Sequence, residues 1–189
     1  MTGNPAETAA SPSDARAVAR AHPKTEAMRG RNSLLLASLL VFAACGEKPY
    51  YEQYRDLASG AWPAGDTLRF EVEVRDTQAT YAVLFHLRAN AQYPFSNLYL
   101  FRQIYSEIGM EYGDTAELKL ADPYGRWLGD GPGDLKTFSR PYRPQPLRFN
   151  RSGHYTFSFV QAMRRDTLAG VRSVGLTLYK QDPNEPKEN

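Results

Sequence analysis

The stretch Leu68-Arg69-Phe70-Glu71-Val72-Glu73-Val74-Arg75 alternates strictly between apolar and charged side chains. Successive side chains of a β-strand point to opposite faces, so this period of two predicts a strand with one apolar face and one ionic face. A strand of that kind is typical of an antiparallel sheet that covers a core on one side and meets water on the other. The stretch therefore predicts a β-sheet protein with half-buried strands.

The same alternation recurs toward the C-terminus. Strands are expected at residues 80–88, 97–105, 116–120, 147–149, 154–160 and 174–179. No segment carries a sustained apolar stripe with a period of 3.6, which argues against helices and against the parallel sheets built from βαβ units. We predict an all-β fold, an antiparallel β-sandwich of about seven or eight strands. Alternation alone leaves jelly-roll and immunoglobulin-like topologies both open.

Polar breaks between these segments are typical of turns that reverse antiparallel strands. We expect turns at Asp76-Thr77, at Tyr112-Gly113-Asp114 and at Asn150-Arg151-Ser152-Gly153. The long segment from Asp122 to Pro146 does not fit the strand pattern, and irregular segments of that length are commonly functional or disordered.

A different pattern precedes the strands. The sequence Val41-Phe42-Ala43-Ala44-Cys45-Gly46 ends an apolar run that begins at Leu34 and follows Arg29 and Arg31. A basic flank, an apolar segment of about 7–15 residues and small residues at the cleavage site define a secretory signal. The run is shorter than the roughly 20 apolar residues of a membrane-spanning helix. With a cysteine directly after the small residues, it reads as a bacterial lipobox, and we predict that Cys45 becomes the lipidated first residue of the mature protein.

The chain is therefore expected to have five parts. Residues 1–25 are rich in Ala, Pro, Ser and charge, and Met28 begins a compact leader. We expect an extension at 1–27, a lipoprotein signal peptide at 28–44, a lipidated tether that becomes ordered at 45–65, the β-sandwich domain at 66–181 and a frayed tail at 182–189.

Charge and cysteine content exclude several classes of function. The first 44 residues hold 5 of the 23 basic and 3 of the 21 acidic residues, which leaves 18 of each in the mature part. A neutral domain has no general electrostatic attraction to nucleic acid. Because Cys45 is the single cysteine, disulfides, CxxC redox chemistry and thiolate zinc sites are not expected either.

The segment from Asp122 to Asp134 carries four glycines, three aspartates and a Trp-Leu pair at Trp127. Asp122, Asp130 and Asp134 offer oxygen ligands of the kind that Ca²⁺ takes, although their spacing matches no EF-hand loop. The alternative is structural, with Asp122 and Asp134 capping turns and Trp127 filling a place in the core.

A second candidate contact site lies before the 97–105 strand, in the loop Tyr93-Pro94-Phe95. Aromatic side chains are common anchors of protein interfaces. We therefore expect Tyr93, Phe95 and the loop around Trp127 to form a surface for a partner or ligand. The remaining titratable candidates, His86 and His154, sit in strand positions where a structural role is expected, and no nucleophile or phosphate-binding motif is present.

Several motifs in one order resemble the gliding motility lipoprotein GldH family. They are the lipobox, Tyr51-x-x-Tyr54-Arg55-x-Leu57 followed by Trp62, the run Gln92 to Leu100, the glycine-rich run Asp122 to Asp134, Gly153-x-Tyr155-x-Phe157, and Gln161-Ala162-Met163-Arg164. The resemblance covers nearly the whole mature chain. It departs at Ser173, where an acidic residue is expected, and residues 1–27 have no counterpart.

This resemblance implies a non-enzymatic, lipid-anchored envelope protein required for gliding, and the outer membrane with its periplasmic face is the expected location. Its expected partners are other proteins of the gliding and linked type IX secretion machinery, with no catalytic residue and no cofactor beyond the lipid on Cys45. A lipid-anchored carbohydrate-binding module is the alternative, since sandwiches with exposed aromatic residues host many functions. A glycan-processing enzyme using Asp130 and Asp134 is a third reading, supported by composition alone.

Overall fold

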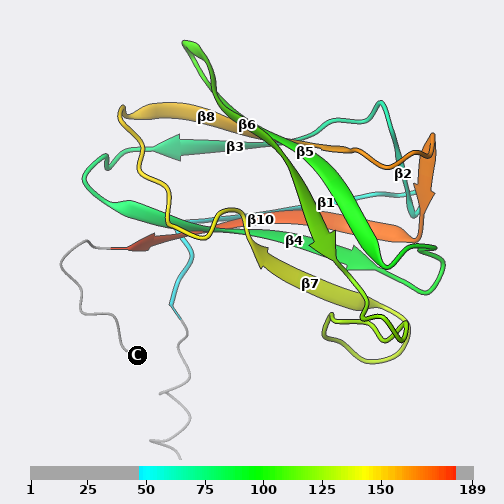
Figure 1. The fold of residues 1–189 in the computed structure, drawn as a ribbon. Helices are drawn as coiled ribbons and strands as arrows, with labels where there is room; N and C mark the ends of the chain where they lie inside the picture. The colour runs from blue at the N-terminus through cyan, green and yellow to red at the C-terminus, as the bar shows by residue number, and fades with distance from the viewer. Residues whose placement is uncertain (1–46, 182–189) are drawn as a thin grey trace, which may run out of the picture. The chain divides into compact units, whose positions relative to one another are not determined.

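The computed structural model describes residues 47–181, so the expected leader, Cys45 and the C-terminal tail lie outside the described residues. Ten β-strands and no helix occur within this range (Figure 1). The strands are β1 Tyr51–Asp56, β2 Ala61–Pro63, β3 Leu68–Val74, β4 Thr80–Ala89, β5 Asn97–Ser106, β6 Gly109–Lys119, β7 Lys136–Pro141, β8 Gly153–Gln161, β9 Thr167–Ala169 and β10 Val171–Gln181.

The strands pair as one long folded hairpin. β5 pairs with β6 at its tip, and moving outward β4 pairs with β7, β3 with β8, β2 with β9 and β1 with β10, all antiparallel. Two further pairings, β10 with β4 and β8 with β5, roll this hairpin up. The result is two four-stranded sheets, in the orders β1-β10-β4-β7 and β3-β8-β5-β6, with β2 and β9 as a small third sheet. This nesting is a jelly roll, which resolves the topology left open by the sequence.

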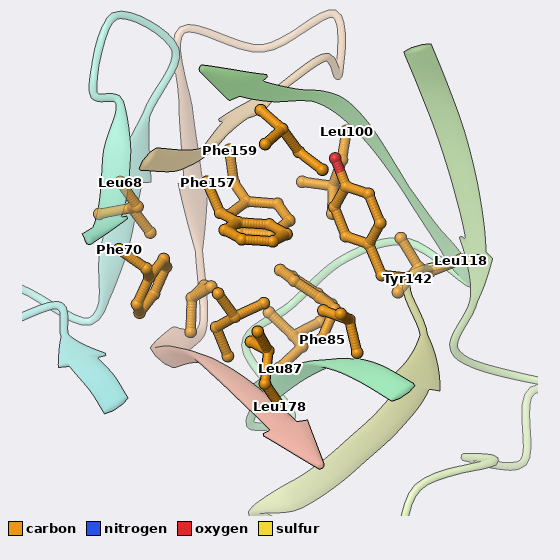
Figure 2. Packing of buried hydrophobic residues seen from close by; sticks show 14 of the residues in the cluster. Leu68, Phe70, Phe85, Leu87, Leu100, Leu118, Tyr142, Phe157, Phe159 and Leu178 are labelled. Atoms are coloured by element: carbon orange, nitrogen blue, oxygen red, sulfur yellow. The ribbon is translucent and has the colours of Figure 1, made fainter. Parts of the chain in front are cut away.

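The apolar faces of the two large sheets form the core. β3 alternates between buried and exposed residues throughout its length, as its sequence predicts. Figure 2 shows Phe157 and Phe159 of β8 facing Phe85 of β4 across the sandwich. The rings of Phe85 and Phe159 lie 4.9 Å apart between centroids, and all three side chains are buried. Burying each such ring is worth about 1.5–3 kcal/mol, so this aromatic layer contributes several kcal/mol to the stability of the fold.

Four strands occur where the sequence pattern gave no strand. The short β2 and β9 pair only with each other. β7 lies inside the segment 122–146 that was expected to be irregular, and both β1 and β2 lie inside the expected tether at 45–65. β7 contributes one buried apolar residue, Phe138, and β1 none, so neither displays an alternating stripe of its own. Both form because a neighbouring strand supplies their hydrogen bonds, β4 for β7 and β10 for β1.

Two other local expectations are wrong. Tyr112-Gly113-Asp114 is not a turn but the middle of β6, where Gly113 lies opposite Gln103 of β5. The reversal occurs instead at Glu107 and Ile108. Residues 147–149 form no strand, and only an isolated bridge joins Leu147 to Tyr81. In both places the long β5 and β4 strands determine the pairing, which overrides the local turn and strand propensities.

The sandwich has two ends that carry different loops. We call one end the Tyr50 end, because the chain joins the sandwich there at Tyr50, just before β1. It also carries the 75–79 loop, the β5–β6 turn and the segment 142–152. We call the other end the Trp127 end. It carries the β4–β5 loop at 90–96, the segment 120–135 and the turns around β2 and β9. In Figure 1 the Tyr50 end lies to the left and the Trp127 end to the right.

Candidate functional site

The structure brings the two predicted contact loops together at the Trp127 end. Tyr93 and Phe95 follow β4, whereas Trp127 lies between β6 and β7. The ring centroids of Tyr93 and Trp127 are 6.5 Å apart, and those of Tyr93 and Phe95 are 6.0 Å apart. The two loops that the sequence suggested as contact sites therefore lie side by side in the fold. The burial and packing of their side chains differ from the expectation.

Tyr93 is buried and is not available to a partner. Its hydroxyl donates a 2.8 Å hydrogen bond to the carbonyl oxygen of Asn97, and burial raises the pKa of this hydroxyl. Phe95 is half-buried against the core. The loop can approach this closely because Gly170, with φ at +80°, faces it: a Cβ there would lie 2.3 Å from the Tyr93 nitrogen. Tyr93 is thus an interior support of the loop rather than a contact anchor.

Trp127 fastens the long segment to the sandwich. Its ring lies 5.8 Å from that of Phe138 on β7, in addition to its contact with Tyr93. Trp127 also bridges to Ala121 through the backbone, and the next residue, Leu128, donates a 2.8 Å backbone hydrogen bond to Leu120. These contacts agree with the structural alternative for Trp127, a side chain packed against the core.

Asp122 caps the first turn of this segment. Its carboxylate accepts hydrogen bonds from the backbone nitrogens of Tyr124 and Arg126, each at 2.9 Å, and from Arg126 Nε at 2.7 Å. The Arg126 backbone bond, reinforced by its guanidinium, lowers the pKa of the Asp122 carboxyl. This carboxylate therefore already accepts three hydrogen bonds within the turn.

The three aspartates do not converge on an ion. Asp130 forms a backbone bridge with Thr137, and Asp134 lies exposed farther along the loop. Within residues 47–181, no three or more His, Cys, Asp or Glu side chains gather in a group that could hold a metal. The geometry thus gives no support to a calcium site made by Asp122, Asp130 and Asp134.

Among the large hydrophobic residues of the segment 120–135, Tyr124 and Leu128 are exposed to solvent. The Tyr124 side chain is 86% exposed and that of Leu128 44%. The Arg126 guanidinium lies 5.7 Å from the centre of the Tyr124 ring. Sequence reasoning singled out Tyr93, Phe95 and Trp127 instead, because the local sequence does not distinguish an aromatic side chain that packs on the core from one that meets solvent. Tyr124 follows a proline in a glycine-bearing turn, a position that is typical of exposed loop tips.

The histidines have the structural settings that were expected of strand residues. His86 is buried, with Nδ1 2.8 Å from Ser139 Oγ and Nε2 2.8 Å from Thr177 Oγ1. Burial lowers the pKa of its imidazole. His154 is exposed on β8. Cys45, the predicted lipid attachment residue, falls outside the described range, and in the range that is described no helix has the length and apolarity needed to cross a bilayer.

The motifs that suggested a family resemblance, apart from the lipobox, fall within the region matched by a family model. The model of the GldH lipoprotein family aligns with residues 49–178, from just before β1 into β10. The chain belongs to the GldH lipoprotein family. The match spans both large sheets and the segment 120–135 around Trp127.

Two curated members of the family cover most of the chain. The gliding motility lipoprotein GldH of Flavobacterium johnsoniae is 33% identical over 164 residues, which is 82% of this chain and 100% of that protein. The gliding motility lipoprotein GldH homolog of Christiangramia forsetii is 30% identical over 156 residues, 79% of this chain and 94% of that protein. Among solved structures, dimeric latent PorU from Porphyromonas gingivalis aligns with 72% of this chain and 13% of its own, at 9% identity and a TM-score of 0.30, too low to define a shared fold.

Proposed function

We propose that this chain is a lipid-anchored envelope protein of the gliding motility machinery that docks other envelope proteins at its Trp127 end. Two relatives named as gliding motility lipoproteins support the process. One observation carries the docking role: the chain joins the sandwich at Tyr50, and the exposed Tyr124 and Leu128 lie at the opposite end. An anchor at one end leaves the other free to meet a partner.

In this proposal Cys45 carries the anchor. A diacylglyceryl group on its thiol and an acyl group on the new amino terminus give about three chains, where two already suffice for stable attachment. The anchor lies in the outer membrane, with the domain on the periplasmic side. Intact mass of the protein from native membranes tests this: an acylated product that begins at Cys45 and is lost in Cys45→Ala supports it, and an unmodified product from the wild type contradicts it.

The segment 120–135, called the Trp127 loop below, is suited to docking because its conformation is fixed in advance. The Asp122 cap, the packing of Trp127 and the Asp130–Thr137 bridge hold its backbone before any partner arrives. A surface that is ordered in advance loses less conformational entropy on binding. The exposed Tyr124 ring is the type of side chain that dominates interface energetics.

The proposal assigns the chain no catalytic step and no cofactor, and its partners are proteins of the gliding and secretion apparatus. A glycan array separates it from the carbohydrate-binding alternative. That alternative would rest on Tyr99 and Phe101, which are partly exposed next to each other on the outer face of β5.

The decisive experiment replaces the exposed loop residues with Tyr124→Ala and Leu128→Ser together. We expect loss of gliding and of co-purifying envelope proteins, while the protein level and thermal unfolding stay unchanged. Phe101→Ala is the matched control, since it removes a half-exposed ring from the sheet face. Full motility and partner capture in the double variant would contradict the docking role. Trp127→Ala is not used, because it is expected to unfold the loop whatever its function.

A further inference from the structure

The fold holds the start of the domain rigidly at Tyr50. Its backbone nitrogen donates a 2.8 Å hydrogen bond to Leu178, and its hydroxyl donates one of 2.7 Å to the Glu73 carbonyl. The ring lies 5.2 Å from that of the buried Tyr81 in an edge-to-face contact. These contacts hold Tyr50 in a fixed place relative to the rest of the Tyr50 end.

Only residues 46–49 separate Tyr50 from Cys45. Five residue steps of about 3.3–3.6 Å span at most about 18 Å, even when fully extended. If Cys45 carries the lipid, as proposed above, the Tyr50 end cannot move farther than this from the membrane surface. This limit rests on the proposed anchor, and its size follows from the length of the intervening chain.

The β5–β6 turn at this end exposes apolar side chains. Ile108 is 70% exposed and Met110 is 61% exposed, at the tip of a hairpin that projects from its sheet (Figure 1). Turns usually carry Gly, Pro, Asn, Asp or Ser, so the isoleucine in this turn is atypical. Met110 is the second residue of β6, directly after the turn. Two neighbouring exposed apolar side chains at the tip of a hairpin point to a surface that is covered in use.

A basic pocket adjoins the same turn. It has a volume of about 210 Å³, and its apolar wall includes Ile108, Phe149 and Tyr155. Three arginines line it, Arg143, Arg148 and Arg151, against one carboxylate, Glu111. Glu107 of the turn is the other nearby acid. A positive rim over an apolar floor complements an amphiphile with an anionic head.

Aromatic contacts connect the pocket to the start of the domain. Tyr81, which packs on Tyr50, lies 5.4 Å from Phe149, and Phe149 lies 4.5 Å from Tyr155. Both Phe149 and Tyr155 line the pocket. The tether attachment, the basic pocket and the apolar turn thus belong to one rigid end.

We propose that the Tyr50 end is a second, non-covalent membrane contact. Ile108 and Met110 enter the interfacial layer of the bilayer that holds the lipid anchor. Arg143, Arg148 and Arg151 bind the phosphates of anionic phospholipid headgroups. This contact acts together with the lipid anchor and fixes the orientation of the domain, so that the Trp127 end points away from the membrane.

The test uses the full lipidated chain with Ile108→Cys, reconstituted into vesicles of phosphatidylethanolamine and phosphatidylglycerol. Because Cys45 would be acylated, the thiol at position 108 takes up an environment-sensitive fluorophore alone. Leu128→Cys, an exposed aliphatic position at the Trp127 end, is the matched control. We expect a blue-shifted emission and quenching by doxyl-labelled lipid at position 108, and neither at position 128.

Removing the charges should weaken the contact. In the background of the labelled protein, Arg148→Gln with Arg151→Gln should shift the docked equilibrium by about fivefold for each arginine, seen as weaker quenching. Replacing phosphatidylglycerol with phosphatidylcholine should act in the same direction. Protein that floats with the vesicles but shows no quenching at position 108 would overturn this inference alone. Wild-type protein that does not float would overturn the Cys45 anchor, and this inference with it.

Discussion

Replacing Phe159 with alanine removes the ring at the centre of the core. Phe159 is fully buried on β8 and contacts rings from three other places in the sandwich. Its centroid lies 4.9 Å from Phe85 on the opposite sheet, 5.8 Å from Phe70 on β3 and 5.9 Å from Tyr142 after β7. The substitution therefore leaves a cavity between the two sheets, where no flexible loop can close it.

The expected loss in the free energy of unfolding is about 3–5 kcal/mol, the range for a buried Phe→Ala change. Three aromatic pairs, each worth about 0.5–1.5 kcal/mol beyond area burial, place it in the upper half of that range. A domain is stable by only about 5–15 kcal/mol in total, so the variant should be close to unfolding. Phe101→Ala on the adjacent β5 strand should cost less than about 1 kcal/mol, because that ring is half-exposed.

Urea unfolding followed by tryptophan fluorescence measures both variants. With a slope of about 2 kcal/mol per molar urea, Phe159→Ala should lower the midpoint by about 2 M. The slope itself should not change, since the same surface is exposed on unfolding. Equal midpoints for Phe159→Ala and Phe101→Ala would refute the assignment of the core to the space between the two large sheets.

Three further predictions follow from polar and glycine positions. Burial lowers the pKa of the His86 imidazole below 6.5, so as the pH falls the unfolded chain takes up a proton before the folded chain does. The contribution of His86 to the free energy of unfolding should therefore be complete above about pH 6.5 and decrease below it. Urea titrations at several pH values across that range measure this change. Asp114→Asn should lower the free energy of unfolding by about 1–2 kcal/mol, because it removes the carboxylate paired with the mostly buried guanidinium of Arg102. Glu73→Gln, at the exposed pair with Arg75, should leave the thermal midpoint unchanged. Gly170→Ala should lower the melting temperature by about 4–8 °C more than Gly133→Ala does. Both glycines have a positive φ, but only at Gly170 would an added Cβ lie against backbone atoms.

The alternation from Leu68 to Val74 was sufficient to predict β3, its buried face and the all-β class, because the period of two is a property of the strand itself. The same reasoning holds for β8 and β10, whose apolar residues Tyr155, Phe157, Val174 and Leu176 are buried as expected. The motif order was likewise enough to predict the family, which the comparisons confirm.

Strands without their own apolar stripe could not be predicted. β1 and β7 exist because β10 and β4 present unpaired backbone groups beside them, and Gly113 is extended because β5 continues opposite it. These are non-local hydrogen bonds, and nothing within a few residues of each segment encodes them. For the same reason the jelly-roll topology depends on the rolling contacts of β10 with β4 and β8 with β5.

The candidate site divides in the same way. Composition alone marked the Trp127 segment and the Tyr93 loop as unusual, since glycines, aspartates and aromatic residues together are rare in a strand. Only the tertiary structure decided which side chains reach solvent: it buries Tyr93, engages Asp122 in its own turn and leaves Tyr124 exposed. Burial depends on what packs against a residue from distant parts of the chain, and that information is not contained in the local sequence.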